Sequence, residues 1–269
     1  MTLMRNRHTK SGRLLEGDFY PIFSDGRRLP TRAPKTKQST VEQAEYNKRQ
    51  AEKKLIRLVN TNFDTGDIIM HPTYEPKYAP QTEEEARRDL TNYLRRVKNY
   101  RKKNGLSELK YIYVIEKQIY KTGENKGRTN WHFHLFMSGM DRNIAEDMWQ
   151  FGIRVNADRF QPERFGPEAA AKYISKDPQG SKRFSCSRNL QKPTVPNPKD
   201  GKITPRAVER LAKERIDDRK YWERKYKGYR FIKCYARYNQ FNGYWYLSVI
   251  MYKTDGDLPE WEVKEWITD

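Results

Sequence analysis

KYIYVIE at residues 110–116 and WHFHLFM at residues 131–137 are the two stretches that decide the fold. Both are rich in β-branched and aromatic residues, which suit the pleated, half-buried surface of a strand. The connection between them includes KTGENKGRTN at residues 121–130, which is rich in turn-forming residues. The two stretches therefore predict a β-hairpin.

The second of these strands carries two histidines on one face. Because strand side chains alternate, His132 and His134 point the same way, about 7 Å apart, and can converge on one cation. If the hairpin closes across residues 117–131, Glu116 lies opposite His132 and completes a site of two histidines and one carboxylate. A register shift of one residue would turn Glu116 away. The alternatives are a solvated histidine pair and an exposed glutamate at a strand end.

The rest of the chain predicts an α+β fold. Capping boxes at Thr40 and Thr82 and apolar residues at intervals of three and four predict helices. We expect a central antiparallel sheet with helices packed on it, followed by a C-terminal helix and β-hairpin. The expected helices cover residues 40–60, 82–105, 143–149, 167–177 and 204–222, and the further strands cover 67–74, 151–155, 229–238 and 244–253.

Composition divides the chain into three expected segments. Residues 1–39 are basic with little apolar periodicity, which predicts a flexible arm that either contacts DNA or is a solvated tail. Residues 40–183 form the domain that carries the hairpin, and residues 184–269 form an extension that packs on it. The outer face of the 82–105 helix is either a DNA-facing surface or a solvated one. Its basic residues are Arg87, Arg88, Arg95, Arg96, Lys98, Arg101, Lys102 and Lys103.

Net charge points to a polyanionic partner. The 269 residues include 54 Lys and Arg against 35 Asp and Glu, a formal net charge of +19, and nucleic acid is the leading candidate. A membrane partner is not expected, since no run of about 18 apolar residues occurs and the N-terminus lacks the apolar core of a signal peptide. The two cysteines have no zinc-ribbon or disulfide spacing. We expect a cytoplasmic protein.

A candidate nucleophile lies downstream in AAKYISKD, where helical spacing places Tyr173 and Lys176 on one face. A phenol with a pKa near 10 is a weak nucleophile unless its anion is stabilised. A neighbouring ammonium stabilises that anion and the charge on an attacked phosphate. Taken alone, Tyr173 would more simply be a core residue among 18 tyrosines.

Together these residues resemble the HUH endonucleases that initiate rolling-circle replication. The segment from His132 to His134 resembles the histidine, hydrophobic, histidine motif, and Tyr173 with Lys176 resembles the downstream Tyr-x-x-Lys motif. Glu116 occupies the place of an acidic third ligand. HPTY at residues 71–74 lies where the first motif is expected, with Thr73 as a DNA contact.

The resemblance implies a split βαβ core like that of RNA-recognition-motif folds, with helices on one face of the sheet. It also implies Mg²⁺ or Mn²⁺ as the ion, single-stranded origin DNA as substrate and a covalent 5′-phosphotyrosine that leaves a free 3′-hydroxyl. One candidate tyrosine implies the single-tyrosine class. Lys172 and Arg128 are expected further DNA contacts. No Walker A pattern is present, so a bacterial host would supply the helicase as well as the polymerase.

Three other functions fit parts of the pattern. The basic helices and the aromatic strands of the C-terminal hairpin also suit a non-catalytic single-strand binder, although those aromatics are more simply core residues. Two histidines and a glutamate could hold zinc in a hydrolase, but water activation needs no downstream tyrosine. Relaxases and transposases share the constellation, and relaxases typically place the tyrosine before the histidines.

Overall fold

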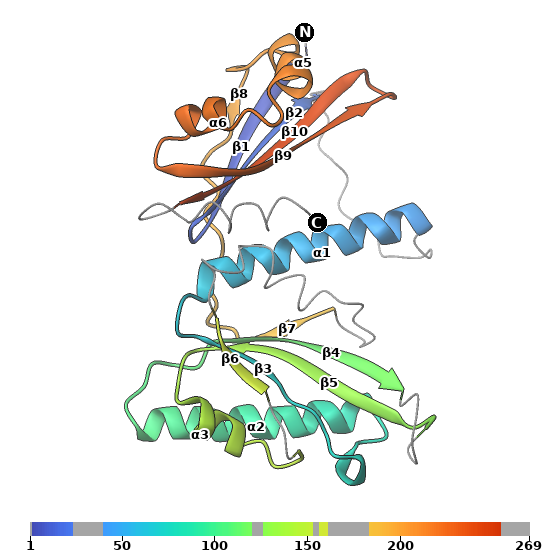
Figure 1. Ribbon diagram of the computed structural model, residues 1–269. Helices are drawn as coiled ribbons and strands as arrows, with labels where there is room; N and C mark the ends of the chain where they lie inside the picture. Colours follow the sequence, from blue (N-terminus) through green and yellow to red (C-terminus); the bar gives the residue numbers. More distant parts are fainter. Residues whose placement is uncertain (1, 24–39, 120–125, 153–155, 161–182, 254–269) are drawn as a thin grey trace. The chain divides into compact units, whose positions relative to one another are not determined.

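The computed structural model describes all residues except 1, 24–39, 120–125, 153–155, 161–182 and 254–269 (Figure 1). The chain forms two compact units. Unit 1 comprises Met1–Lys53 and Lys192–Asp269, and unit 2 comprises Lys54–Gln191. Each unit contains a five-stranded antiparallel sheet with helices, which confirms the α+β class.

Unit 2 contains the predicted hairpin. Its sheet has the order β6-β3-β5-β4-β7. In β4 and β5, Glu116 pairs with His132 and Val114 pairs with His134, so the predicted register is confirmed. The strands are β3 (Ile68–His71), β4 (Tyr111–Ile119), β5 (Thr129–Met137), β6 (Asn156–Arg159) and β7 (Ser185–Cys186).

Two predicted strands of unit 2 differ from the structure. The strand expected at 67–74 ends at His71 because Pro72 follows and has no N–H for the ladder. The strand expected at 151–155 was misplaced, since Phe151 and Gly152 lie outside β6 and residues 153–155 lie outside the described residues. Shorter elements complete the unit: η1 (Pro76–Tyr78) and α3 (Arg142–Asp147).

Helices lie on both faces of this sheet, whereas the resemblance implied one. The helix α2 (Glu83–Lys103) begins with the predicted Thr82–Glu85 capping box and packs Val97 among Phe133 and Leu135. The opposite face, which carries Val114 and Phe136, packs against residues 54–62 of α1 (Val41–Asn62). The alternation that separates Phe133 from His134 therefore places the histidines on the α1 side of the sheet.

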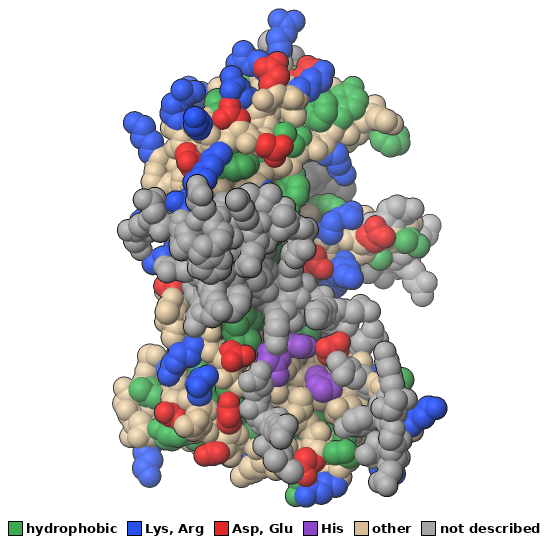
Figure 2. Space-filling model, in the orientation of Figure 1, with side chains coloured by type: hydrophobic (Ala, Val, Ile, Leu, Met, Phe, Trp, Pro, Cys, Tyr) green, Lys and Arg blue, Asp and Glu red, His purple; other side chains and the backbone are tan. Residues whose placement is uncertain are grey.

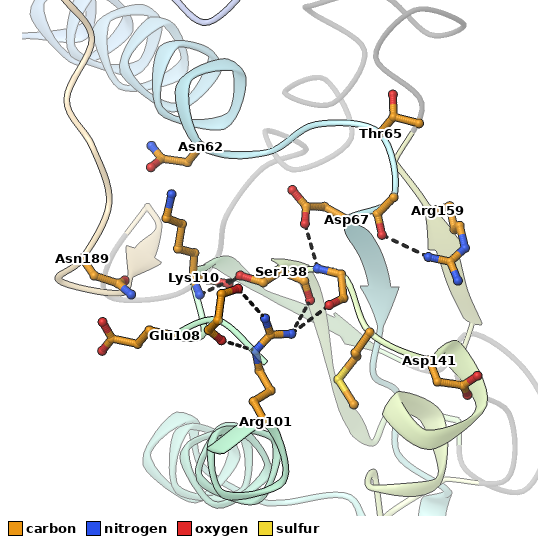
Figure 3. A pocket seen from close by; sticks show the side chains of 14 residues that line it. Asn62, Thr65, Asp67, Arg101, Glu108, Lys110, Ser138, Asp141, Arg159 and Asn189 are labelled. Carbon is orange, nitrogen blue, oxygen red and sulfur yellow. Dashed lines mark hydrogen bonds between the residues drawn. The ribbon is translucent and has the colours of Figure 1, made fainter. Parts of the chain in front are cut away.

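Arg101 is not part of the outer basic face of α2, as its spacing suggested, but is buried (3% exposed). Figure 3 shows its guanidinium reaching the loops that flank the sheet. Nε donates to Ser107 O at 2.9 Å, Nη1 to Gly139 O at 2.8 Å and to Ser138 O at 3.3 Å, and Nη2 to Ser107 Oγ at 3.0 Å. One cation thus satisfies carbonyls from two loops.

We expect Arg101→Met to lower the free energy of unfolding by at least about 2 kcal/mol, since the substitution leaves buried carbonyls without donors. The matched control is Lys102→Met at the exposed neighbouring position, with an expected change within about 0.5 kcal/mol. Urea unfolding followed by tryptophan fluorescence measures both. Equal midpoints for the two variants would show that the Arg101 hydrogen bonds contribute nothing.

Unit 1 corrects the prediction of a flexible arm at residues 1–39. Its sheet has the order β8-β1-β2-β10-β9. The first two strands form a hairpin around Gly12, whose φ of 57° suits glycine in a tight turn. The remaining arm residues, 24–39, lie outside the described residues. The strands are β1 (Leu3–Ser11), β2 (Leu14–Ile22), β8 (Lys199–Asp200), β9 (Tyr229–Asn239) and β10 (Tyr244–Lys253).

The helices of unit 1 pack on one face of its sheet (Figure 1). The helix expected at 204–222 is two helices, α5 (Pro205–Glu214) and α6 (Arg219–Lys225), because Asp218 begins a new helix by accepting from the Tyr221 N–H. Among the described residues, no helix combines the length and apolar character needed to cross a membrane. The predicted packing of residues 184–269 on the domain at 40–183 stays a prediction.

Candidate metal and DNA site

The candidate site lies at the end of the unit 2 sheet where β3 stops and β5 begins. Figure 2 shows histidine side chains (purple) reaching the surface with acidic side chains beside them. His134 Nε2 lies 2.9 Å from Glu116 Oε2, a contact between neighbouring strands. The structure therefore brings together the carboxylate and one histidine of the predicted metal site.

His71 joins this pair, although the sequence left it unassigned. Its Nδ1 lies 3.1 Å from His134 Nδ1, and the two rings meet edge to face with centroids 5.0 Å apart. If His134 donates to Glu116 through Nε2–H, its Nδ1 accepts from the His71 Nδ1–H, which makes both imidazoles neutral. The available signal was that three of the four histidines of the chain fall in HPTY and WHFHLFM.

His132 points toward a different neighbour. Its Nε2 lies 3.0 Å from Asn130 Nδ2, which donates to it from the same face of β5. Within the described part of the chain, no three His, Cys, Asp or Glu side chains are arranged to hold a metal ion. The set of His132, His134 and Glu116 therefore stays a prediction, although imidazole and carboxylate are donor types suited to a divalent cation.

Burial favours the neutral form of two of these histidines. It lowers the pKa of His71 to about 4, with His134 and His132 as nearby imidazoles that add to the effect. It also lowers the pKa of His132, against the opposing influence of Glu116. Neutral imidazole is the form that coordinates metals.

The turn after His71 is held against β5 by three contacts. The Phe133 N–H donates to Pro72 O at 3.2 Å, and Trp149 Nε1 donates to Thr73 O at 2.7 Å. A Cβ on Gly152 would lie only 2.5 Å from that same Thr73 oxygen, so the close approach requires glycine. Thr73, the predicted DNA contact, is thus fixed beside the histidines.

Arg128 is exposed just before β5 and lines a cavity of about 600 Å³. The opposite wall includes Pro76 and Gln81, which follow the Thr73 turn. The cavity therefore adjoins the histidine end of the sheet, where a DNA-contacting cation would be needed. The DNA-binding role of Arg128 stays a prediction.

Tyr173, Lys176 and Lys172 lie outside the described residues, so their predicted roles are untested. Two described tyrosines of unit 2 are poor nucleophiles. The Tyr74 hydroxyl donates to Asp89 at 3.2 Å and that of Tyr93 to Ala145 O at 3.0 Å, and burial raises the pKa of both. Neither phenol is poised to ionise near neutral pH.

A larger cavity, of about 900 Å³, lies at the opposite end of the same sheet (Figure 3). Its walls include Asp67 before β3, Lys110 before β4 and Gly139 after β5. Its Arg101 is engaged by backbone carbonyls, as described above, and Arg159 donates to Gly66 O at 3.1 Å. These contacts hold loops together and lie away from the histidines.

Residues 72–178 match the family model of the replication-associated protein ORF2. This span falls inside unit 2 and includes Glu116, Arg128, His132, His134 and the segment with Tyr173. The match supports a replication-associated role for the chain and DNA as its partner. No curated protein and no solved structure matches the chain. Unit 1 lies outside the match.

Proposed function

We propose that the chain is a rolling-circle replication initiator of the single-tyrosine type, which nicks single-stranded origin DNA. The observation that carries the proposal is the juxtaposition of His134 with Glu116, with His132 on the same strand face, inside the segment that matches the replication-associated family. We infer that these three residues hold Mg²⁺ or Mn²⁺. When bound, the ion would act as a Lewis acid on a non-bridging phosphate oxygen.

The covalent step belongs to Tyr173. Its phenolate oxygen forms a bond to the scissile phosphorus, the bond from phosphorus to the 3′ oxygen breaks, and that oxygen takes up a proton. The 5′ end is then held as a phosphotyrosine ester. Lys176 stabilises the phenolate and the charge that develops on the phosphate. Thr73, Arg128 and Lys172 hold the strand in place.

The products define the partners that the reaction needs. A free 3′-hydroxyl serves as a primer for a host polymerase, and a host helicase separates the strands. Attack of a free 3′-hydroxyl on the phosphotyrosine reverses the chemistry and joins ends at termination. These partners suit the cytoplasm of a bacterial host.

Cleavage of labelled single-stranded oligonucleotides that tile the element encoding the chain tests the proposal. We expect one cleavage position with Mg²⁺ or Mn²⁺, none with EDTA, and extension of the upstream product by a polymerase. Binding without cleavage under every metal condition would instead support a non-catalytic single-strand binder.

A further inference from the structure

The β9–β10 hairpin of unit 1 extends beyond its neighbour in the sheet. The ladder between β2 and β10 ends at the Phe19–Leu247 pair, whereas β9 and β10 continue to pair as far as Asn239 and Tyr244. Figure 1 shows the tip of this hairpin projecting away from α5 and α6. The outer part of the hairpin is therefore a two-stranded ribbon.

This ribbon is aromatic and basic. Tyr235 and Tyr238 are 53% and 48% exposed, and Phe241 at the turn is fully exposed. Figure 2 shows hydrophobic and aromatic side chains at the surface of the hairpin. The segment from 229 to 253 contains four basic residues and no acidic one. Isolated exposed aromatics are unremarkable, but a cluster on one hairpin indicates a binding surface.

One face alternates rings with cations at strand spacing. Tyr235 and Arg237 are two residues apart on β9, about 7 Å along the strand, and Tyr246 pairs directly with Arg237. The Arg237 guanidinium lies 5.9 Å from the centre of the Tyr246 ring, and Lys233 Nζ lies 5.0 Å from that of Tyr235. Each ring thus has a cation beside it.

We propose that this face, formed by Tyr235, Arg237, Tyr246 and Lys233, is a second binding surface for single-stranded DNA, outside the segment that matches the replication-associated family. Exposed rings stack on unpaired bases, and the cations beside them contact phosphates. A duplex buries its bases and offers these rings no stacking partner. A second copy of a chain with net charge +19 is repelled by the cations.

The inference rests on the proposed function only in taking DNA as the partner. Binding is therefore measured without chemistry, on full-length protein carrying Tyr173→Phe, in EDTA. The probes are a fluorescein-labelled oligothymidine and a labelled duplex of the same length. We expect Tyr235→Ala with Tyr246→Ala to weaken single-strand affinity by at least about tenfold, because each stacked base contributes about 1–3 kcal/mol.

Two controls separate stacking from folding. Tyr235→Phe with Tyr246→Phe keeps the rings, and its affinity should stay within about twofold of the parent protein if stacking is the interaction. Tyr46→Ala removes an exposed tyrosine of α1 and should leave affinity unchanged. Arg237→Gln should reduce the slope of log affinity against log salt by about one.

Three results would overturn the inference. The double alanine variant could bind the single strand as the parent does, or lose single-strand and duplex affinity equally, or change its oligomeric state at unchanged DNA affinity. The last result would identify a contact between chains. If the wild-type chain never nicks DNA but the double alanine variant alone loses single-strand affinity, the proposed nickase function fails and this surface stands.

Discussion

Tyr173→Phe is expected to abolish nicking of single-stranded origin DNA, with a fall in rate of at least about 10³-fold. Phenylalanine keeps the ring and its packing but has no oxygen to form the bond to phosphorus. Loss of the nucleophile removes the whole covalent route, so the effect should approach the uncatalysed background. Gel-based cleavage of a labelled oligonucleotide with Mn²⁺ measures it.

The matched control for that substitution is Tyr100→Phe on α2, where the ring packs against the core of unit 2. We expect Tyr100→Phe to nick at the wild-type rate and Tyr173→Phe to bind the oligonucleotide with wild-type affinity. Wild-type nicking by Tyr173→Phe would move the nucleophile to another residue and leave the metal site unaffected.

Glu116→Gln and His134→Ala are expected to lower the Mn²⁺-dependent nicking rate by at least about 100-fold each. The amide loses the anionic donor and the alanine loses the imidazole, so the cation that polarises the phosphate is held weakly or not at all. The rates are measured across a Mn²⁺ titration, and Mn²⁺ affinity is measured separately by calorimetry.

The carboxylate control is Glu108→Gln, an exposed residue beside the cavity at the other end of the sheet. We expect it to bind Mn²⁺ and nick as the wild type does. If Glu116→Gln also retains wild-type Mn²⁺ affinity, the contact between His134 and Glu116 is only a hydrogen bond between strands and the proposed ligand set is wrong.

The hairpin at the centre of unit 2 could be predicted from sequence because its determinants are local. Alternation in WHFHLFM separates the core residues Phe133 and Leu135 from the histidines, and burial of one face fixes the register that places Glu116 opposite His132. The Thr82 capping box likewise fixes the start of α2 within one turn.

Unit 1 could not be predicted because its core is assembled from the two ends of the chain. The strand β1 has one fully buried aliphatic side chain, Met4, and so shows little periodicity. Its stability comes from β2, which pairs in turn with β10 more than 200 residues later. Local pattern carries no information about such a partner.

The unpredicted features of unit 2 also depend on long-range contacts. His71 reaches the candidate site only because β3 lies beside β5. Arg101 looks like a solvent-facing cation on a helical wheel, but the loops that follow α2 and β5 enclose it. Side-chain spacing within one element describes a face of that element and not what covers it.

The central claim is a covalent bond between Tyr173 and the 5′ end of nicked DNA. Intact mass of the wild-type chain, measured after incubation with single-stranded origin DNA and Mn²⁺, tests it most directly, with proteolysis to map the modified peptide. The account predicts an added mass equal to the downstream fragment, carried by the peptide that contains Tyr173. An adduct on a different residue, or complete cleavage with no adduct, would contradict it.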